Sequence, residues 1–320
     1  MAAVIATAEM GETLGGYRHE ALLYSGGDGF AAATLPFIRA AVASHEPILV
    51  AVEAPKIDLL RHDLGSIASG VSFADMAEIG HNPALIISAW SAFVSEQADS
   101  GRPVRGIGEP VDAGRSPAAL SECQLHESLL NLAFADETSF WLLCPYDTTT
   151  LATEVIDEAR KSHPWVSDGV AVQRSKLFKR IDPSRPFDRR LPPAPDSAAD
   201  MAFVPETFGK VREFVTDEAR RAGLDSERAG ALCLAVSELT TNSIHHGGGV
   251  GTVRAWSEDG FVVVEVADHG EIKAPLVGRL PPSTDLESGR GLWIVHQLCD
   301  LVQIQSSRAS GTLVRVHMRL

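Results

Sequence analysis

Apolar and polar positions follow one repeating pattern through the first half of the chain. Short apolar runs, of which Ile48–Val52 and Phe140–Cys144 are the clearest, alternate with longer segments in which apolar residues recur at helical spacing. Repeated alternation of strand and helix is typical of a mostly parallel sheet with helices on both faces. We therefore expect an α/β N-terminal domain.

The order of elements in this half can be read from its turns and periodicity. A short strand at Ala21–Tyr24 is followed by a glycine-rich turn at Ser25–Gly29 and a helix at Phe30–Ser44. Weaker strands are expected near Val71–Phe73 and Val104–Ile107. Further helical patterns cover Pro83–Ala98, Pro117–Ala135 and Thr148–Lys161.

The second half has a different order, with helices first and strands afterwards. An amphipathic helix is predicted at Pro205–Ala222, with Gly223 as its C-cap, and a second at Ala229–His246, with Asp225 or Ser226 as its N-cap. The expected strands are Gly251–Trp256, Phe261–Ala267, Leu301–Ser306 and Thr312–Met318, with a helix at Gly291–Cys299 before the last two. Helices on one face of an antiparallel or mixed sheet form an α+β sandwich.

The composition changes between the two halves. Residues 174–190 hold seven basic and two acidic side chains, and a proline-rich stretch, Leu191–Pro195, follows. Proline and charge without periodicity indicate a linker. We expect an N-terminal domain at 1–173, a linker at 174–204 and a C-terminal domain at 205–320. The basic run is either a solvated connector or a docking strip for an acidic surface.

Charge and composition narrow the class of protein. The chain has 320 residues and a formal net charge of −14, which argues against a nucleic-acid or anionic-membrane surface. It has no run of the roughly 20 apolar residues needed to span a bilayer, and Met1–Met10 lacks the basic start of a signal peptide. The four cysteines are far apart, as in a reduced cytoplasmic protein. The eleven histidines show no metal-binding spacing.

Chemistry-bearing residues cluster in the second half. Glu238 and Asn242 are four residues apart on the second helix and therefore share one face. Asp268-His269-Gly270 follows a strand, Gly289-Arg290-Gly291 opens a helix, and Gly311-Thr312 opens the last strand. An acid, an amide, an Asp after a strand and two glycine turns, in this order, resemble the ATP site of the GHKL group. The closest fit is to the anti-sigma-factor serine kinases of that group.

The resemblance implies a role for each of these positions. Asn242 would bind Mg2+ through its amide oxygen, and Glu238 would act as the general base toward a serine hydroxyl or water. Asp268 would accept a hydrogen bond from the adenine amine. Further ATP-binding positions, at the adenine and phosphate ends of the nucleotide, would be Gly270, Gly289, Arg290, Gly291 and Thr312.

One departure from the family pattern leaves alternatives open. Where the family has Asp-x-Gly-x-Gly, the second glycine is missing and Glu271-Ile272 stand at the start of the ATP lid. A carboxylate there could repel phosphate, so a non-catalytic nucleotide-binding module is one alternative. A histidine-kinase-like sensor is another, although the helix at Pro205–Ala222 contains no histidine to accept phosphate.

Scattered motifs in the first half resemble a second family. They are His19-Glu20, Gly108-Glu109, Glu127, Cys144-Pro145-Tyr146-Asp147 and His163-Pro164. They are similar to the MEDS sensory domain of methanogens and methylotrophs, which implies a fold related to the RecA/KaiC ATPases. Ser25–Gly29 lacks the lysine of a P-loop. We therefore expect this domain to sense or dock, with Glu20, Glu109 and Glu127 as candidates to line a pocket, and not to hydrolyse ATP.

Together the two resemblances imply a partner switch. The C-terminal domain would bind a sigma factor and would phosphorylate a serine of a STAS-domain anti-anti-sigma factor, using ATP and Mg2+. The N-terminal domain would bias that choice. Kinases of this type usually dimerise through the ATP-binding domain, so a homodimer is expected.

Overall fold

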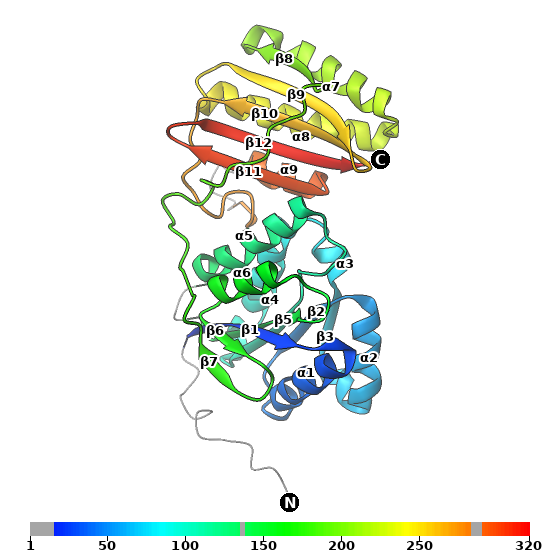
Figure 1. The fold of residues 1–320 in the computed structure, drawn as a ribbon, viewed down its shortest axis with the longest axis vertical. Helices are drawn as coiled ribbons and strands as arrows, with labels where there is room; N and C mark the ends of the chain where they lie inside the picture. Colours follow the sequence, from blue (N-terminus) through cyan, green and yellow to red (C-terminus); the bar gives the residue numbers. More distant parts are fainter. Residues whose placement is uncertain (1–15, 135–137, 283–289) are drawn as a thin grey trace, which may run out of the picture. The chain divides into compact units, whose positions relative to one another are not determined.

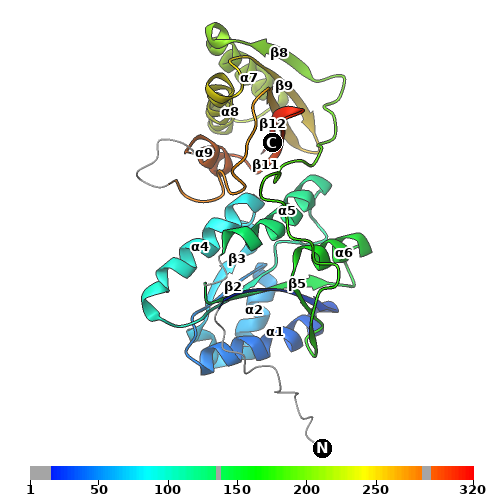
Figure 2. The ribbon, with the colours of Figure 1, turned by 90° about the vertical axis from the view of Figure 1, so that its left-hand side faces the viewer.

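The computed structural model describes residues 16–134, 138–282 and 290–320 and separates into two compact units (Figures 1 and 2). The first unit comprises Met1–Ala74, Phe93–Glu109 and Phe134–Phe178. The second comprises Asp75–Ala92, Pro110–Ala133 and Lys179–Leu320. The division is therefore not a single cut in the chain, because two segments of the first half belong to the second unit.

A seven-stranded, mostly parallel sheet organises the first unit. Its order is β3-β2-β4-β5-β1-β6-β7. β1 pairs in parallel with β5 and β6, β4 pairs in parallel with β2 and β5, and only the β6–β7 pairing is antiparallel among those described. The strands are β1 (Tyr17–Tyr24), β2 (Ile48–Val52), β3 (Ser72–Asp75), β4 (Val104–Gly108), β5 (Phe140–Asp147), β6 (Trp165–Ser167) and β7 (Val172–Arg174). The expected α/β class is confirmed.

Helices α1 (Gly26–Ala43) and α2 (Ala54–Leu64) cover one face of this sheet, and α6 (Thr153–Ser162) lies on the other (Figure 2). Phe30, Ile38 and Leu60 are fully buried against the strands. Short 3-10 turns, η1 (Gly65–Gly70) and η3 (Ala98–Ser100), join these elements. Parallel strands with apolar side chains on both faces need this cover.

One expectation for this region was wrong, and one helix was not foreseen. The glycine-rich segment at Ser25–Gly29 is not a separate turn, because α1 begins at Gly26. The Asp147 carboxylate accepts a hydrogen bond from the Gly26 amide at 3.2 Å, so a side chain from another strand end holds this helix start. Helix α2 was not foreseen, although Pro55 in its first turn is a common helix-start signal.

The second unit contains an antiparallel five-stranded sheet with helices on one face. Its order is β11-β12-β10-β9-β8. The strands are β8 (Ala199–Phe203), β9 (Gly251–Glu258), β10 (Phe261–Asp268), β11 (Leu301–Ser307) and β12 (Gly311–Arg319). Helices α7 (Phe208–Ala222), α8 (Ser226–His246) and α9 (Arg290–Leu298) pack on it, and η4 (Pro205–Thr207) precedes α7. The expected α+β sandwich is confirmed.

Local chemistry accounts for the helix ends in this unit. Gly223 has φ +93° and ends α7 in the left-handed conformation that favours glycine. The Asp225 side chain accepts a hydrogen bond from the Arg228 amide at 2.9 Å and so caps α8. Leu232, Ala235 and Val236 of α8 are buried in the core of the unit, whereas Glu238 and Asn242 of the same helix are only partly buried.

The region between residues 174 and 204 packs more closely than a free linker. Phe187 is 1% exposed and lies in the core of the second unit, and its carbonyl accepts a hydrogen bond from the Ser306 amide. The Pro192 carbonyl accepts a hydrogen bond from Arg315 at 2.7 Å. β8 adds the edge strand before residue 205. The division into a sensory domain, a linker and an ATP-binding domain stays a prediction.

Segments from the first half of the chain complete the second unit. They are α3 (Met76–Ile79), η2 (Pro83–Leu85), the start of α4 (Ile86–Glu96) and α5 (Pro117–Ala133). Asn82 donates hydrogen bonds to the carbonyls of His296 and Cys299 at the end of α9. Glu122 of α5 forms a buried ion pair with Arg279 at 2.9 Å. The first contact lies at the C-terminal end of α9, and the second involves Arg279, which precedes that helix in the chain.

Candidate nucleotide site

Helix α8 presents Glu238 and Asn242 toward the start of α9. A methyl group added to Gly291 would lie 3.0 Å from Glu238 Oε2 and 3.3 Å from Asn242 Nδ2. The α9 backbone therefore approaches both side chains as closely as a residue without a side chain allows. The Glu238 carboxylate and the Asn242 side-chain amide thus lie next to the start of α9. Free backbone amides and the positive end of the helix dipole favour an anion there.

Asp268 ends β10 and is held from two sides. Its Oδ2 accepts a hydrogen bond from Ser243 Oγ at 2.6 Å, and its Oδ1 accepts one from the Gly270 amide at 2.7 Å. Ser243 follows Asn242 on α8, so one helix positions both side chains. A carboxylate has about four acceptor positions, so a further donor such as an adenine amine can still bind Asp268.

Close backbone packing surrounds Asp268. A methyl group on Gly247 would lie 2.3 Å from Asp268 Cγ, and one on Gly311 would lie 2.1 Å from the Asp268 carbonyl oxygen. Gly311 also has φ +76°, a conformation that other residues rarely adopt. Sequence reasoning named Gly270 and missed Gly247, although its place directly after α8 is a common position for glycine.

Thr312 joins a hydroxyl network beside Gly270. Its Oγ1 lies 2.7 Å from Ser306 Oγ and donates to the Gly270 carbonyl at 3.0 Å, while Ser306 Oγ accepts a hydrogen bond from the Ile272 amide at 2.8 Å. The network links the ends of β11 and β12 to the segment that follows Asp268. Ser306 was not among the expected site residues, because an isolated serine on a strand carries no sequence signal.

The remaining expected positions lie around the start of α9. Arg290 is its first residue and is exposed, so its guanidinium is open to an anionic ligand. Gly289 lies outside the described residues. Glu271, next to Ile272 where the family pattern has its second glycine, forms an ion pair with Lys273 at 3.5 Å, which partly offsets its charge. This pairing reduces the repulsion that a carboxylate there would exert on phosphate.

A pocket of about 460 Å³ lies beside β8 and β9 and includes Asp268, His269 and Ser310 in its lining. It includes neither Glu238 nor Asn242, so it is not the surface where the acid and the amide meet. The candidate site is therefore defined by the close approach of α8 and α9 at Gly291 and not by this pocket.

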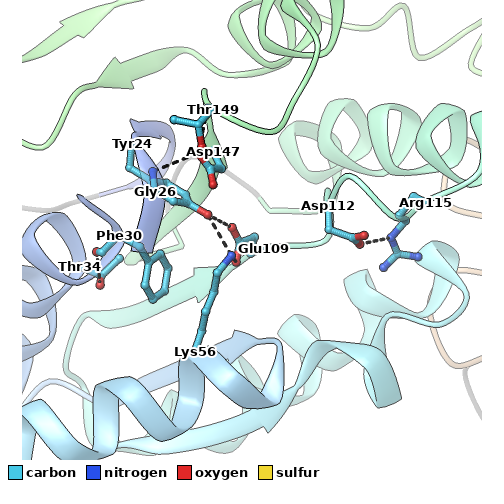
Figure 3. A network of polar contacts seen from close by, with 10 residues as sticks. All are labelled: Tyr24, Gly26, Phe30, Thr34, Lys56, Glu109, Asp112, Arg115, Asp147 and Thr149. Carbon is cyan, nitrogen blue, oxygen red and sulfur yellow. Dashed lines mark hydrogen bonds and ion pairs between the residues drawn. The ribbon is translucent and has the colours of Figure 1, made fainter. Parts of the chain in front are cut away.

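The strand ends of the first unit hold a different polar network (Figure 3). Glu109 accepts hydrogen bonds from Tyr24 at 2.6 Å and from Lys56 at 2.5 Å. Burial raises the pKa of Glu109, and the Lys56 ammonium opposes that shift. Where a P-loop would hold phosphate, the Asp147 carboxylate already caps the first turn of α1. This network links Tyr24 at the end of β1 to Lys56 of α2 and to Glu109, which follows β4.

The other two carboxylates singled out in the first half are also buried. Glu20 forms an ion pair with Arg18 at 2.8 Å and accepts a hydrogen bond from Trp141 at 3.2 Å. Its partners differ from Tyr24 and Lys56, the partners of Glu109, and a pocket shared by the three carboxylates stays a prediction. Glu127 lies on α5 in the second unit and is 1% exposed.

Comparison with known proteins gives one family match in each half of the chain. Residues 18–164 match the family described as the MEthanogen/methylotroph, DcmR Sensory domain (MEDS), and residues 201–318 match the histidine kinase-like ATPase domain. The second match contains every position of the candidate nucleotide site. The first contains the carboxylates of the parallel sheet.

Two curated relatives identify the class more closely. The anti-sigma F factor of Clostridium acetobutylicum is 34% identical over 130 residues, which cover 37% of this chain and 91% of that protein. The anti-sigma F factor of Heyndrickxia coagulans is 36% identical over 96 residues, covering 27% of this chain and 65% of that protein. The chain therefore belongs to the anti-sigma factors with a GHKL-type ATPase domain, and it carries a MEDS domain before that region.

One solved structure is also similar in part. It contains the RsbU and RsbW domains of a Mycobacterium tuberculosis protein and shares 20% identity with 38% of this chain and 32% of its own, with a TM-score of 0.29. A score this low carries no argument about the fold. In the described residues, no helix combines the length and apolar character that crossing a membrane requires.

Proposed function

We propose that this chain is a cytoplasmic anti-sigma regulator whose C-terminal region binds ATP with Mg2+ and phosphorylates a serine of a STAS anti-anti-sigma partner. The observation that carries the proposal is the close approach of Gly291 to Glu238 and Asn242, on the helix whose next residue, Ser243, donates a hydrogen bond to Asp268. The residues fit the nucleotide: an amide oxygen suits a hard cation, and the glycine backbone leaves room for phosphate.

Each residue has a defined task in this proposal. Asn242 holds the metal ion through its amide oxygen, and the ion supplies charge neutralisation at the phosphates. Glu238 accepts the proton of the attacking serine hydroxyl. Asp268 orients the adenine through its exocyclic amine, while Arg290 and the α9 amides bind the phosphate end.

The relatives, which are anti-sigma F factors, support a sigma factor as one partner. In the proposed switch, the ATP-binding region holds a sigma factor until an unphosphorylated STAS partner displaces it, and phosphorylation of that partner prevents the displacement. A homodimer formed through the ATP-binding region is part of this proposal. The MEDS region, with a RecA/KaiC-like sheet, would bias the choice of partner through its signal.

The test is Mg-ATP titration followed by phosphoryl transfer to purified STAS-domain proteins. Wild-type protein should bind Mg-ATP, Asn242→Ala should lose magnesium-dependent binding, and Glu238→Gln should bind ATP and the STAS partner but transfer no phosphate. Gly230→Ala, on the same helix with no atom near its added methyl group, is the matched control. Magnesium-dependent binding that Asn242→Ala leaves unchanged would contradict the site.

Glu271 supports a second candidate function, a nucleotide-binding module without catalysis. In that case wild-type protein would bind Mg-ATP and a STAS partner, yet no partner would be phosphorylated. Glu271→Gly, with Ile272→Gly beside it to restore the family pattern, would then produce transfer. Acid-labile phosphate on the chain itself would instead favour a histidine-kinase-like sensor.

A further inference from the structure

Three motifs of the first half that the nucleotide site does not use converge inside the first unit. His19 lies on β1, Cys144 lies on β5 and His163 follows α6. His19 and Cys144 are on the same face of the sheet, because β1 and β5 pair with Ala21 opposite Cys144 and Leu142 opposite His19. The ligand atoms of the three side chains all lie within 4.8 Å of one another.

We propose that His19, Cys144 and His163 bind a divalent transition-metal ion of the zinc class. The distance from Cys144 Sγ to His19 Nε2 is 3.4 Å. A sulfur and a nitrogen on one tetrahedral zinc ion are about 3.6 Å apart, since Zn–S is about 2.3 Å and Zn–N about 2.0–2.1 Å. The two side chains therefore already have nearly the spacing that shared coordination requires.

The orientation of His163 supports the same assignment. Its Nδ1 lies 2.8 Å from the Ala159 carbonyl oxygen, which only accepts hydrogen bonds, so Nδ1 carries the proton. Nε2 then carries the lone pair that a metal ion needs. A ligand histidine commonly donates its other ring N–H to a carbonyl in this way, which fixes the tautomer and the direction of the ring.

The donor set and its burial select the class of ion. Thiolate and imidazole together suit zinc and its neighbours in the transition series and do not suit magnesium or calcium. His19, Cys144 and His163 are each at most 1% exposed, which suits a structural or sensory ion more than one that meets a large substrate. On binding, the Cys144 thiol loses its proton to solvent and the sulfur–metal bond forms, so affinity should fall as pH is lowered.

The experiment uses the full-length protein with Zn2+ and, as a spectroscopic probe, Co2+. Wild-type protein should bind one Zn2+ against a competing chelator, and Co2+ should give a thiolate-to-metal charge-transfer band. X-ray absorption at the zinc edge should show one sulfur and two imidazole nitrogens, any further ligand being oxygen. Cys144→Ser should abolish the cobalt band, and His163→Gln should weaken zinc binding at least tenfold. Matched controls are Cys123→Ser, a buried thiol, and His62→Gln, an exposed imidazole.

Three results would overturn the proposal. The first is a wild-type zinc shell without sulfur, which needs no variant and so holds even if the variants fail to fold. The second is a cobalt band that survives in folded Cys144→Ser but disappears in Cys123→Ser. The third is no zinc bound by folded wild-type protein, which would make the three side chains a hydrogen-bonded cluster. None of these results bears on Mg-ATP binding, so the proposed function is tested separately.

Discussion

At the residue scale, the Asp268 carboxylate has two roles. It accepts a hydrogen bond from the Gly270 amide in the turn after β10, and in the proposed function it would also accept one from adenine. Asp268→Asn should weaken the binding of ATP more than the binding of inorganic triphosphate. The reason is that an amide nitrogen cannot accept a hydrogen bond and would face the adenine amine as a second donor. The expected loss for ATP is about 1–3 kcal/mol, measured by calorimetric titration of both ligands.

Ser243→Ala is the control for that change. It removes the hydroxyl that donates to Asp268 and leaves the carboxylate in place. If Asp268→Asn weakens the binding of triphosphate and of ATP equally, the residue orders the loop and does not contact the adenine. Thermal unfolding of both variants separates a general loss of structure from a loss of adenine contact.

His317 provides a pH dependence of stability. Burial, followed by the nearby Arg315 guanidinium, lowers its pKa to about 4, and its Nε2 lies 3.1 Å from Gln303 Oε1. Between pH 6.5 and about 4, the unfolded chain takes up a proton at this residue that the folded chain does not. The free energy of unfolding should therefore fall as pH is lowered through this window, by about 1–3 kcal/mol from this group.

Denaturant unfolding of wild type and His317→Gln across that pH range measures the effect. In His317→Gln, the slope of the unfolding free energy against pH should be smaller. The control His81→Gln, which replaces an exposed histidine, should keep the full slope. Some slope will persist in His317→Gln because burial also lowers the pKa of His296 well below its usual range. Identical slopes in all three proteins would exclude His317 as a source.

At the scale of elements, a side chain at position 291 would crowd the contact between α8 and α9. Gly291→Ala should reduce Mg-ATP affinity about tenfold or more, because its methyl group would meet Glu238 and Asn242 at 3.0–3.3 Å and displace them. Gly230→Ala adds the same methyl group to α8 in open space and should leave affinity unchanged. Equal affinities of the two variants would mean that these side chains do not bind the nucleotide.

The buried ion pair between Glu122 of α5 and Arg279, which precedes α9, is a second contact between elements. Glu122 is 3% and Arg279 0% exposed, and burial raises the pKa of Glu122 while Arg279 opposes the shift. Glu122→Ala should cost about 3–5 kcal/mol in unfolding free energy, because it leaves a buried guanidinium without its counter-charge. In the double variant Glu122→Leu/Arg279→Met most of that loss should be recovered. A loss of the same size in the double variant would show that packing and not charge is responsible.

Elements with strong periodicity or clear caps could be predicted from the sequence. Gly223 and Asp225 mark the ends of α7 and α8 within a residue or two, and the alternating valines of β10 mark that strand. The glycine-rich start of α1 was mistaken for a turn, because a carboxylate 121 residues away satisfies its first amide. Ser306 and the cluster of His19, Cys144 and His163 could not be predicted, since only strand pairing brings such distant residues together.

For the whole molecule, the two family matches and the two compact units do not coincide. Residues 75–92 and 110–133 lie within the MEDS match, yet they pack in the same unit as the ATPase match. Through Asn82 and Glu122, this part of the MEDS match contacts the end of α9 and the residue Arg279 that precedes it. Residues of the MEDS match are therefore part of the packing at the C-terminal end of α9.

A fragment comprising residues 173–320 tests this connection. Without Glu122, the Arg279 guanidinium loses its counter-charge, and without Asn82 the last carbonyls of α9 lose two donors. The fragment should fold but unfold at a temperature lower by on the order of 10 °C than the second unit of the intact chain. Arg279→Met in the fragment should recover part of this difference, because it removes the uncompensated charge. The expectation is contradicted if the fragment unfolds at the same temperature as the intact chain and Arg279→Met does not raise that temperature. The MEDS residues would then contact the ATPase region without stabilising it.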